Sequence, residues 1–163
     1  HKFLNEMRLA LKKGFSFGLT SGIITTLGLM VGLFSGTASQ LVVMGGILTI
    51  AVADSMSDAL GIHMSEESVN DNHSQVWATT ISTFITKFIF SLTFAIPVLL
   101  FNLKTAIIIS IVWGLLLLVI INYKMAIAKK EKPAKLIFEH VSIAILVIIV
   151  TYLIGIWTSI VFK

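Results

Sequence analysis

Two aspartates stand inside one of the most apolar stretches of the chain. Asp54 and Asp58 are four residues apart in the segment AVADSMSDALGIH, so on a helix they share one face. A carboxylate at the centre of a bilayer costs about 3 kcal/mol on insertion scales, so it requires a cation, a proton or a basic partner. Because hard divalent cations prefer carboxylate oxygens, the pair predicts a divalent-metal site.

The alternative to a metal is an ion pair with Lys87, which stands in the next apolar stretch. A rise of about 1.5 Å per residue places Asp54 and Lys87 at similar depth and leaves Asp58 without a basic partner. We therefore expect Asp58 to bind the ion, with Lys87 as a built-in counter-ion of the empty site. Whether Asp54 binds metal or only pairs with Lys87 stays open at this point.

Other candidate ligands lie near these aspartates. Ser21, in the preceding apolar stretch, is expected at the depth of Asp58, where its hydroxyl would be a weak ligand or hold a metal-bound water. The alternative for Ser21 is a hydrogen bond back to its own helix. His63, Glu66 and Glu67 follow Asp58 and form either a mouth that attracts cations or an ordinary solvated connector.

Catalytic motifs are missing from the sequence. It contains no phosphate-binding loop, no HExxH motif and no nucleophile–base motif, and it has no cysteine. We therefore expect a protein that is not an enzyme and holds no permanently bound cofactor.

The elements that must position these residues are membrane helices. Of the 163 residues 56% are hydrophobic and only 12% charged, and the mean hydropathy is +0.98. Crossing a ~30 Å hydrocarbon core takes roughly 20 apolar residues. Five stretches qualify: 15–34, 41–63, 76–101, 106–123 and 137–162. The sequence therefore predicts an all-α fold, with one transmembrane domain of five helices over residues 1–163 and a kink at Pro97 in the third.

The first fourteen residues are basic and amphipathic. Such a segment either lies along the cytoplasmic membrane surface or extends the first helix. We expect a cytoplasmic lead-in over residues 1–14 and leave both arrangements open.

Basic residues predict the orientation, because cytoplasmic loops carry an excess of lysine and arginine. Nine fall on one side: Lys2, Arg8, Lys12, Lys13, Lys124, Lys129, Lys130, Lys132 and Lys135. Only Lys104 and Lys163 fall on the other. We therefore expect a cytoplasmic amino terminus and an external carboxyl terminus, in a plasma or inner membrane rather than an organelle membrane.

The first helix carries two sets of glycines at a spacing of four: Gly14, Gly18 and Gly22, then Gly28, Gly32 and Gly36. Small residues at this spacing let membrane helices approach closely. They serve either packing within one protomer or a dimer seam. We expect a homodimer formed through this helix.

Three segments resemble the vacuolar iron transporter family. FGLTSGIITTLGLMVGLFSG is similar to the family's opening helix with its Gly-Leu-Ser-Asp-Gly step, and SDALGIHMSEES to its Ser-Met-Gly-Leu-Gly-x-Tyr-Leu-x-x-x-Ser segment. TYLIG resembles the family's closing Tyr-Leu-Ile-Gly. The resemblance implies a five-helix homodimer that exchanges Fe²⁺ or Mn²⁺ for protons, with a metal path near the dimer axis lined by the first two helices.

The chain also departs from that family. Ser21 stands where the family has an aspartate, and Asp58 stands where it has a methionine. Losing a thioether shifts the preference toward harder ions such as Mn²⁺. The short connector SEESVNDNHSQ replaces the family's cytoplasmic metal-binding insertion. The function expected is proton-coupled export of Fe²⁺ or Mn²⁺; the alternative is a non-transporting membrane sensor or assembly subunit, which needs no intramembrane acidic pair.

Overall fold

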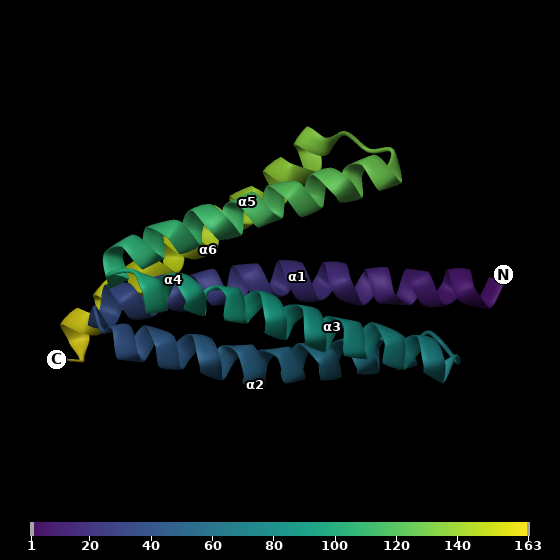
Figure 1. Cartoon of the computed structure of the whole chain (residues 1–163), viewed down its shortest axis with the longest axis horizontal. Helices are drawn as coiled ribbons and strands as arrows, with labels where there is room; N and C mark the ends of the chain where they lie inside the picture. The colour runs from purple at the N-terminus through teal and green to yellow at the C-terminus, as the bar shows by residue number, and fades with distance from the viewer. Residues whose placement is uncertain (1, 163) are drawn as a thin grey trace. The chain divides into compact units, whose positions relative to one another are not determined.

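The computed structural model describes residues 2–162, apart from the side chain of Lys2. Two lysines counted for the orientation, Lys163 and the side chain of Lys2, lie outside the described part. The elements are α1 (Lys2–Thr37), α2 (Gln40–Glu67), α3 (His73–Thr93), α4 (Ala95–Leu100), α5 (Leu103–Lys129) and α6 (Pro133–Val161), with no strand among the described residues (Figure 1). Five helical spans are long and apolar enough to cross a membrane, with α3 and α4 counted as one. This confirms the all-helical fold with five spans and is compatible with a multi-pass integral membrane protein.

The predicted lead-in is part of α1, which begins at Lys2 and continues without a break to Thr37. Two side chains of α3 bind the backbone of this segment. Thr79 donates from Oγ1 to the Ala10 carbonyl at 3.3 Å, and Ser82 donates from Oγ to the Leu11 carbonyl at 2.9 Å. Of the two arrangements considered for this segment, the structure has the helical extension.

The third predicted helix, 76–101, is divided in two. Helix α3 ends at Thr93 and α4 begins at Ala95, so the interruption falls on Phe94. Pro97 has no N–H for the carbonyl four residues before it, which is that of Thr93, and its ring crowds that carbonyl. The expected kink is therefore a break in the helix.

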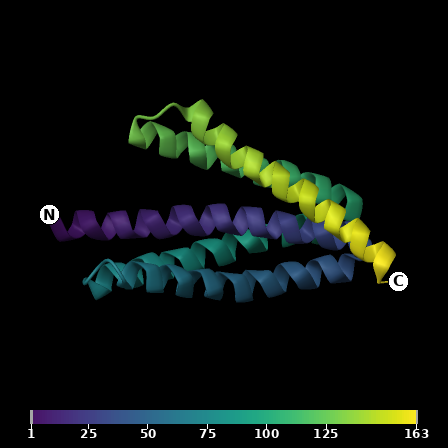
Figure 2. The same cartoon turned by 180° about the vertical axis from the view of Figure 1, so that it is seen from behind.

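The chain folds as two compact units, and both sets of helices can be followed in Figures 1 and 2. The first unit contains α1 up to Ile23 together with Leu48–Thr93, so α2 and α3 lie side by side in it. The second unit contains Ile24–Ile47 and the chain from Phe94 onward, in which α5 and α6 pack against each other as a hairpin. The candidate ligands all lie in the first unit.

The glycines of α1 are used inside the chain. A Cβ at Gly18 would lie 2.6 Å from the Thr83 carbonyl oxygen of α3, in the first unit. A Cβ at Gly28 would lie 2.8 Å from Val147 Cγ1 of α6, in the second. Both sets of glycines therefore pack against helices of the same protomer. The glycine spacing no longer supports a homodimer through α1, and the homodimer stays a prediction.

Helix α3 has a polar inner face and an apolar outer face. Its buried side chains include Thr79, Thr83, Thr86, Lys87 and Ser91. Its outer face carries exposed isoleucines: Ile81, Ile85 and Ile89. This arrangement suits a helix that faces lipid, because the interior can supply the hydrogen bonds that lipid cannot.

Candidate metal-binding site

The Lys87 side chain lies at the centre of the site and is fully buried. Its Nζ lies 2.5 Å from Asp54 Oδ2 and 2.5 Å from Asp58 Oδ2. It also donates a hydrogen bond to Ser21 Oγ at 2.9 Å. One ammonium group from α3 thus lies among three oxygens, two from α2 and one from α1, all within the first unit.

Hydrogen bonds hold the three oxygens unequally. Ser21 accepts from Lys87 and donates to Asp58 Oδ2 at 2.6 Å, so its hydroxyl joins both charged groups. Asp54 Oδ2 meets Lys87 as an ion pair but is buried without a hydrogen-bond partner. Asp58 is therefore fixed by directional contacts, while Asp54 is held by charge alone.

A glycine of α1 makes room for the lysine. A Cβ at Gly22 would lie 3.2 Å from Lys87 Cγ and 3.3 Å from the Lys87 carbonyl oxygen. Since Gly22 follows Ser21 directly, close approach of α1 and α3 brings the Ser21 hydroxyl to the end of the lysine side chain. The glycine spacing therefore serves the site as well as the packing.

The contacts of Lys87 differ in part from those considered from the sequence. The pair of Lys87 with Asp54, which was one of two alternatives left open, is present. The expectation that Asp58 lacks a basic partner is wrong, because the same Nζ contacts it. Depth counting treats a lysine as a point, whereas its four-carbon stem places the ammonium between two carboxylates that are one helical turn apart.

Carboxylates outnumber basic groups in this cluster. Two carboxylates face one ammonium, so with both ionised the cluster would carry one negative charge, and among residues 3–162 no second basic side chain pairs with either aspartate. The Asp54 and Asp58 side chains are 28% and 24% exposed, although Asp54 Oδ2, the atom that meets Lys87, is itself buried. Three oxygens around one positive centre are the kind of donor set that hard cations prefer.

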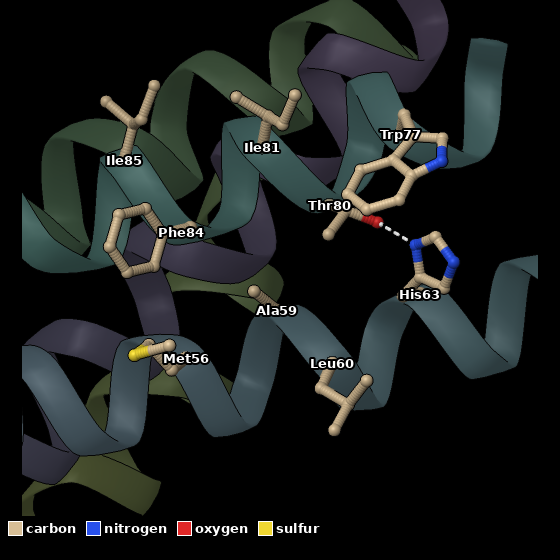
Figure 3. A pocket seen from close by; sticks show the side chains of 9 residues that line it. All are labelled: Met56, Ala59, Leu60, His63, Trp77, Thr80, Ile81, Phe84 and Ile85. Carbon is tan, nitrogen blue, oxygen red and sulfur yellow. Dashed lines mark hydrogen bonds between the residues drawn. The ribbon is translucent and has the colours of Figure 1, made fainter.

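His63 takes no part in this cluster. Its Nδ1 forms a 2.9 Å hydrogen bond with Thr80 Oγ1, and its ring lies 4.6 Å from that of Trp77, centre to centre. Figure 3 shows the three side chains at one end of an apolar groove of about 570 Å³ between α2 and α3. Sequence reasoning did not find Thr80 or Trp77 as partners of His63, although their positions near the start of the third predicted helix offered the signal.

The predicted mouth cluster is also divided. Glu66 is buried and forms an ion pair with Lys13 of α1. Glu67 is exposed. Among the described residues no group of three or more His, Asp or Glu side chains is placed to hold a metal ion. The structure therefore brings together Asp54, Asp58 and Ser21, and leaves His63, Glu66 and Glu67 apart from them.

Comparisons with known proteins found no relative of this chain. No family model, curated protein or solved structure matches the chain. The likeness to the vacuolar iron transporter family therefore stays an expectation from the motifs. Functional inference rests on the site.

Proposed function

We propose that this protein transports a divalent cation, Fe²⁺ or Mn²⁺, out of the cytoplasm in exchange for protons. The observation that supports it is the oxygen cluster of Asp54, Asp58 and Ser21, which sets two carboxylates against one ammonium. A negative charge within a membrane is expensive and is tolerated mainly where function requires it. A passing cation would meet that requirement.

The Lys87 ammonium acts in this proposal as a tethered substitute for the metal. An arriving divalent cation takes its place between the two carboxylates, whose charges balance the ion when the displaced Lys87 gives up its proton. Carboxylates bind metal when ionised and can take up protons when it leaves, so the same groups couple the two fluxes. All three candidate ligands are oxygen donors, which favours hard ions over soft ones.

The exposed side of the site suggests where a second copy would bind. On α2 a row of small, exposed residues at a spacing of four runs beside the two aspartates: Thr49, Ala53, Ser57, Gly61 and Ser65. A Cβ at Gly61 would meet nothing within 4 Å. We therefore propose that the homodimer contact lies on α2, not on α1. On α2 it would cover the exposed edges of Asp54 and Asp58.

Gly61→Leu should then yield monomers in chemical cross-linking, whereas an unchanged dimer would exclude this contact.

The proposed setting is a plasma or inner membrane with the amino terminus in the cytoplasm. The turn between α2 and α3 then lies on the cytoplasmic side. The Lys13–Glu66 pair joins α1 to α2 at that end of the first unit.

Proteoliposomes that contain a metal-sensitive dye test the proposed function. Mn²⁺ and Fe²⁺ should enter in the presence of an imposed pH gradient, and should enter more slowly once the gradient is collapsed. Vesicles without protein are the control. No metal signal with any of several divalent ions, under either condition, would refute transport.

A second function has one observation in its favour. Lys87 already fills the position between the carboxylates, as it would in a cluster that only holds three helices together. The protein would then be a non-transporting membrane sensor or assembly subunit. In that case replacing the whole cluster with apolar residues should preserve the fold and the function together.

A further inference from the structure

Five lysines gather in the second unit where α5 ends and α6 begins. We call this surface the lysine turn: Lys124, Lys129, Lys130, Lys132 and Lys135. All five are exposed, and none forms an ion pair with another described residue. Glu131 and Glu139 are the acidic residues among them, so the segment has a net charge of about plus three at neutral pH.

The fold of the turn does not account for Lys130. This residue has left-handed backbone angles, φ 57° and ψ 32°. Its N–H bonds to the Ile127 carbonyl at 3.1 Å, and the N–H of Glu131 bonds to that of Ala126 at 2.9 Å. Glycine is the residue that this helix ending favours, because a side chain is strained there. The backbone conformation of the turn therefore gives no reason for a lysine at this position.

The start of α6 does not account for its lysines either. Lys132 is the residue before the helix and makes no capping hydrogen bond with its side chain, and the first turn contains no acidic residue. The amino-terminal end of a helix disfavours positive charge, so Lys132 and Lys135 stand where an acidic residue would be more stable. An external anion bound near Lys132 and Lys135 would offset this unfavourable interaction at both positions.

An apolar band borders the lysine turn on both helices. Tyr123 and Ile127 of α5 are 51% and 56% exposed, and Phe138 of α6 is 75% exposed. Tyrosine is enriched at the boundary between hydrocarbon and headgroups, and lysine side chains extend from that boundary toward the polar side. In a membrane, this arrangement would put the lysine ammonium groups at the level of the lipid phosphates.

We infer that the lysine turn binds the headgroups of anionic phospholipids, with the acyl chains against the apolar band. The phosphodiester supplies the negative charge that neither helix provides, and the exposed Tyr123, Ile127 and Phe138 fit a ligand that also has a hydrocarbon part. A free phosphate ion would satisfy the lysines but not the apolar band. This inference does not depend on the transport proposed above.

The test is a titration of the purified full-length protein in neutral detergent with short-chain phosphatidylglycerol, phosphatidylcholine or inorganic phosphate. Phosphatidylglycerol should bind at least tenfold more tightly than phosphatidylcholine, and its affinity should fall as NaCl is raised. Inorganic phosphate should compete weakly. Equal affinity for the two lipids would overturn the inference, and competition by phosphate as strong as by the lipid would reassign the surface to a free anion.

Variants locate the effect on the turn. Lys130→Gly removes a charge and supplies the residue that the turn favours, so it should fold and lose roughly fivefold in phosphatidylglycerol affinity. Lys104→Gln removes one exposed charge elsewhere and should change nothing. Combining Lys130→Gly with Lys129→Gln and Lys132→Gln should abolish the preference for the anionic lipid. A triple variant that keeps the preference would show that the lysine turn is not the binding surface.

Discussion

The Lys87 ammonium lies 2.5 Å from the Asp58 carboxylate and is hydrogen-bonded to the Ser21 hydroxyl, which itself bonds to Asp58. These three side chains come from three helices, so one cluster of polar contacts connects α1, α2 and α3 inside the first unit. The same ammonium also contacts Asp54. The stability of the unit and the proposed ion site therefore depend on the same few atoms.

Removal of the central cation should destabilise the protein strongly. Lys87→Met leaves two carboxylates facing each other without a basic partner, and breaking a buried ion pair in this way costs roughly 3–5 kcal/mol. A lowered thermal transition in detergent would show it. Lys104→Met, at an exposed position, is the matched control and should stay within about 0.5 kcal/mol of the wild type. Equal stability of the two variants would mean that the ion pairs are not formed in the detergent-solubilised protein.

A double replacement decides the role of Asp54. Asp54→Asn should lower metal transport more than tenfold, because one of the two charged ligands is lost. If Asp54 binds metal, transport should stay low when Lys87→Met is added, although the double variant is more stable than Lys87→Met alone. Recovery of metal flux in the double variant would assign Asp54 to neutralising Lys87 only.

The close contact of α1 with α3 predicts a sharp difference between two glycines. Gly18→Ala places a methyl group 2.6 Å from a backbone carbonyl, so the helices must separate at a cost of about 1–3 kcal/mol. Gly45→Ala meets nothing within 4 Å and should be nearly neutral. Thermal unfolding of both variants in the same detergent measures this difference. The packing described here would be wrong if Gly45→Ala were the more damaging change.

Much of this fold could be predicted from the sequence, and the limits have physical causes. The five spans follow from apolar length alone, and the glycine spacing correctly indicated close packing. Pro97 signalled a disturbed helix, but not that the helix would end at Thr93. The approach of Lys87 to Asp58 could not be read from depth, because it depends on helix rotation and on a flexible lysine stem.

The mouth cluster shows the same limit for the site. His63, Glu66 and Glu67 were expected to form either a cation-attracting mouth or an ordinary solvated connector. Glu66 is instead buried against Lys13, and His63 bonds to Thr80. Both outcomes depend on which neighbour a helix face meets, and the sequence of one helix does not contain that information.

Cysteine labelling tests the orientation, because the chain has no cysteine of its own. Lys132→Cys should react with a membrane-impermeant maleimide only after the cytoplasmic side is opened. Ser39→Cys should react from outside the intact cell, because a cytoplasmic amino terminus followed by one crossing would put the α1–α2 connection there. Labelling in the opposite pattern would invert the topology and with it the proposed direction of export.

Metal flux in matched proteoliposomes tests the central proposal most directly. Wild type and Asp58→Asn are reconstituted at equal density, and Mn²⁺ entry is followed under the same pH gradient. The substitution keeps the shape of the side chain and removes its charge, and Lys87 retains Asp54 as a partner, so the variant should insert and fold. We predict that the wild type carries Mn²⁺ and that Asp58→Asn does not. Entry at the wild-type rate in Asp58→Asn would show that the ion does not pass through this cluster.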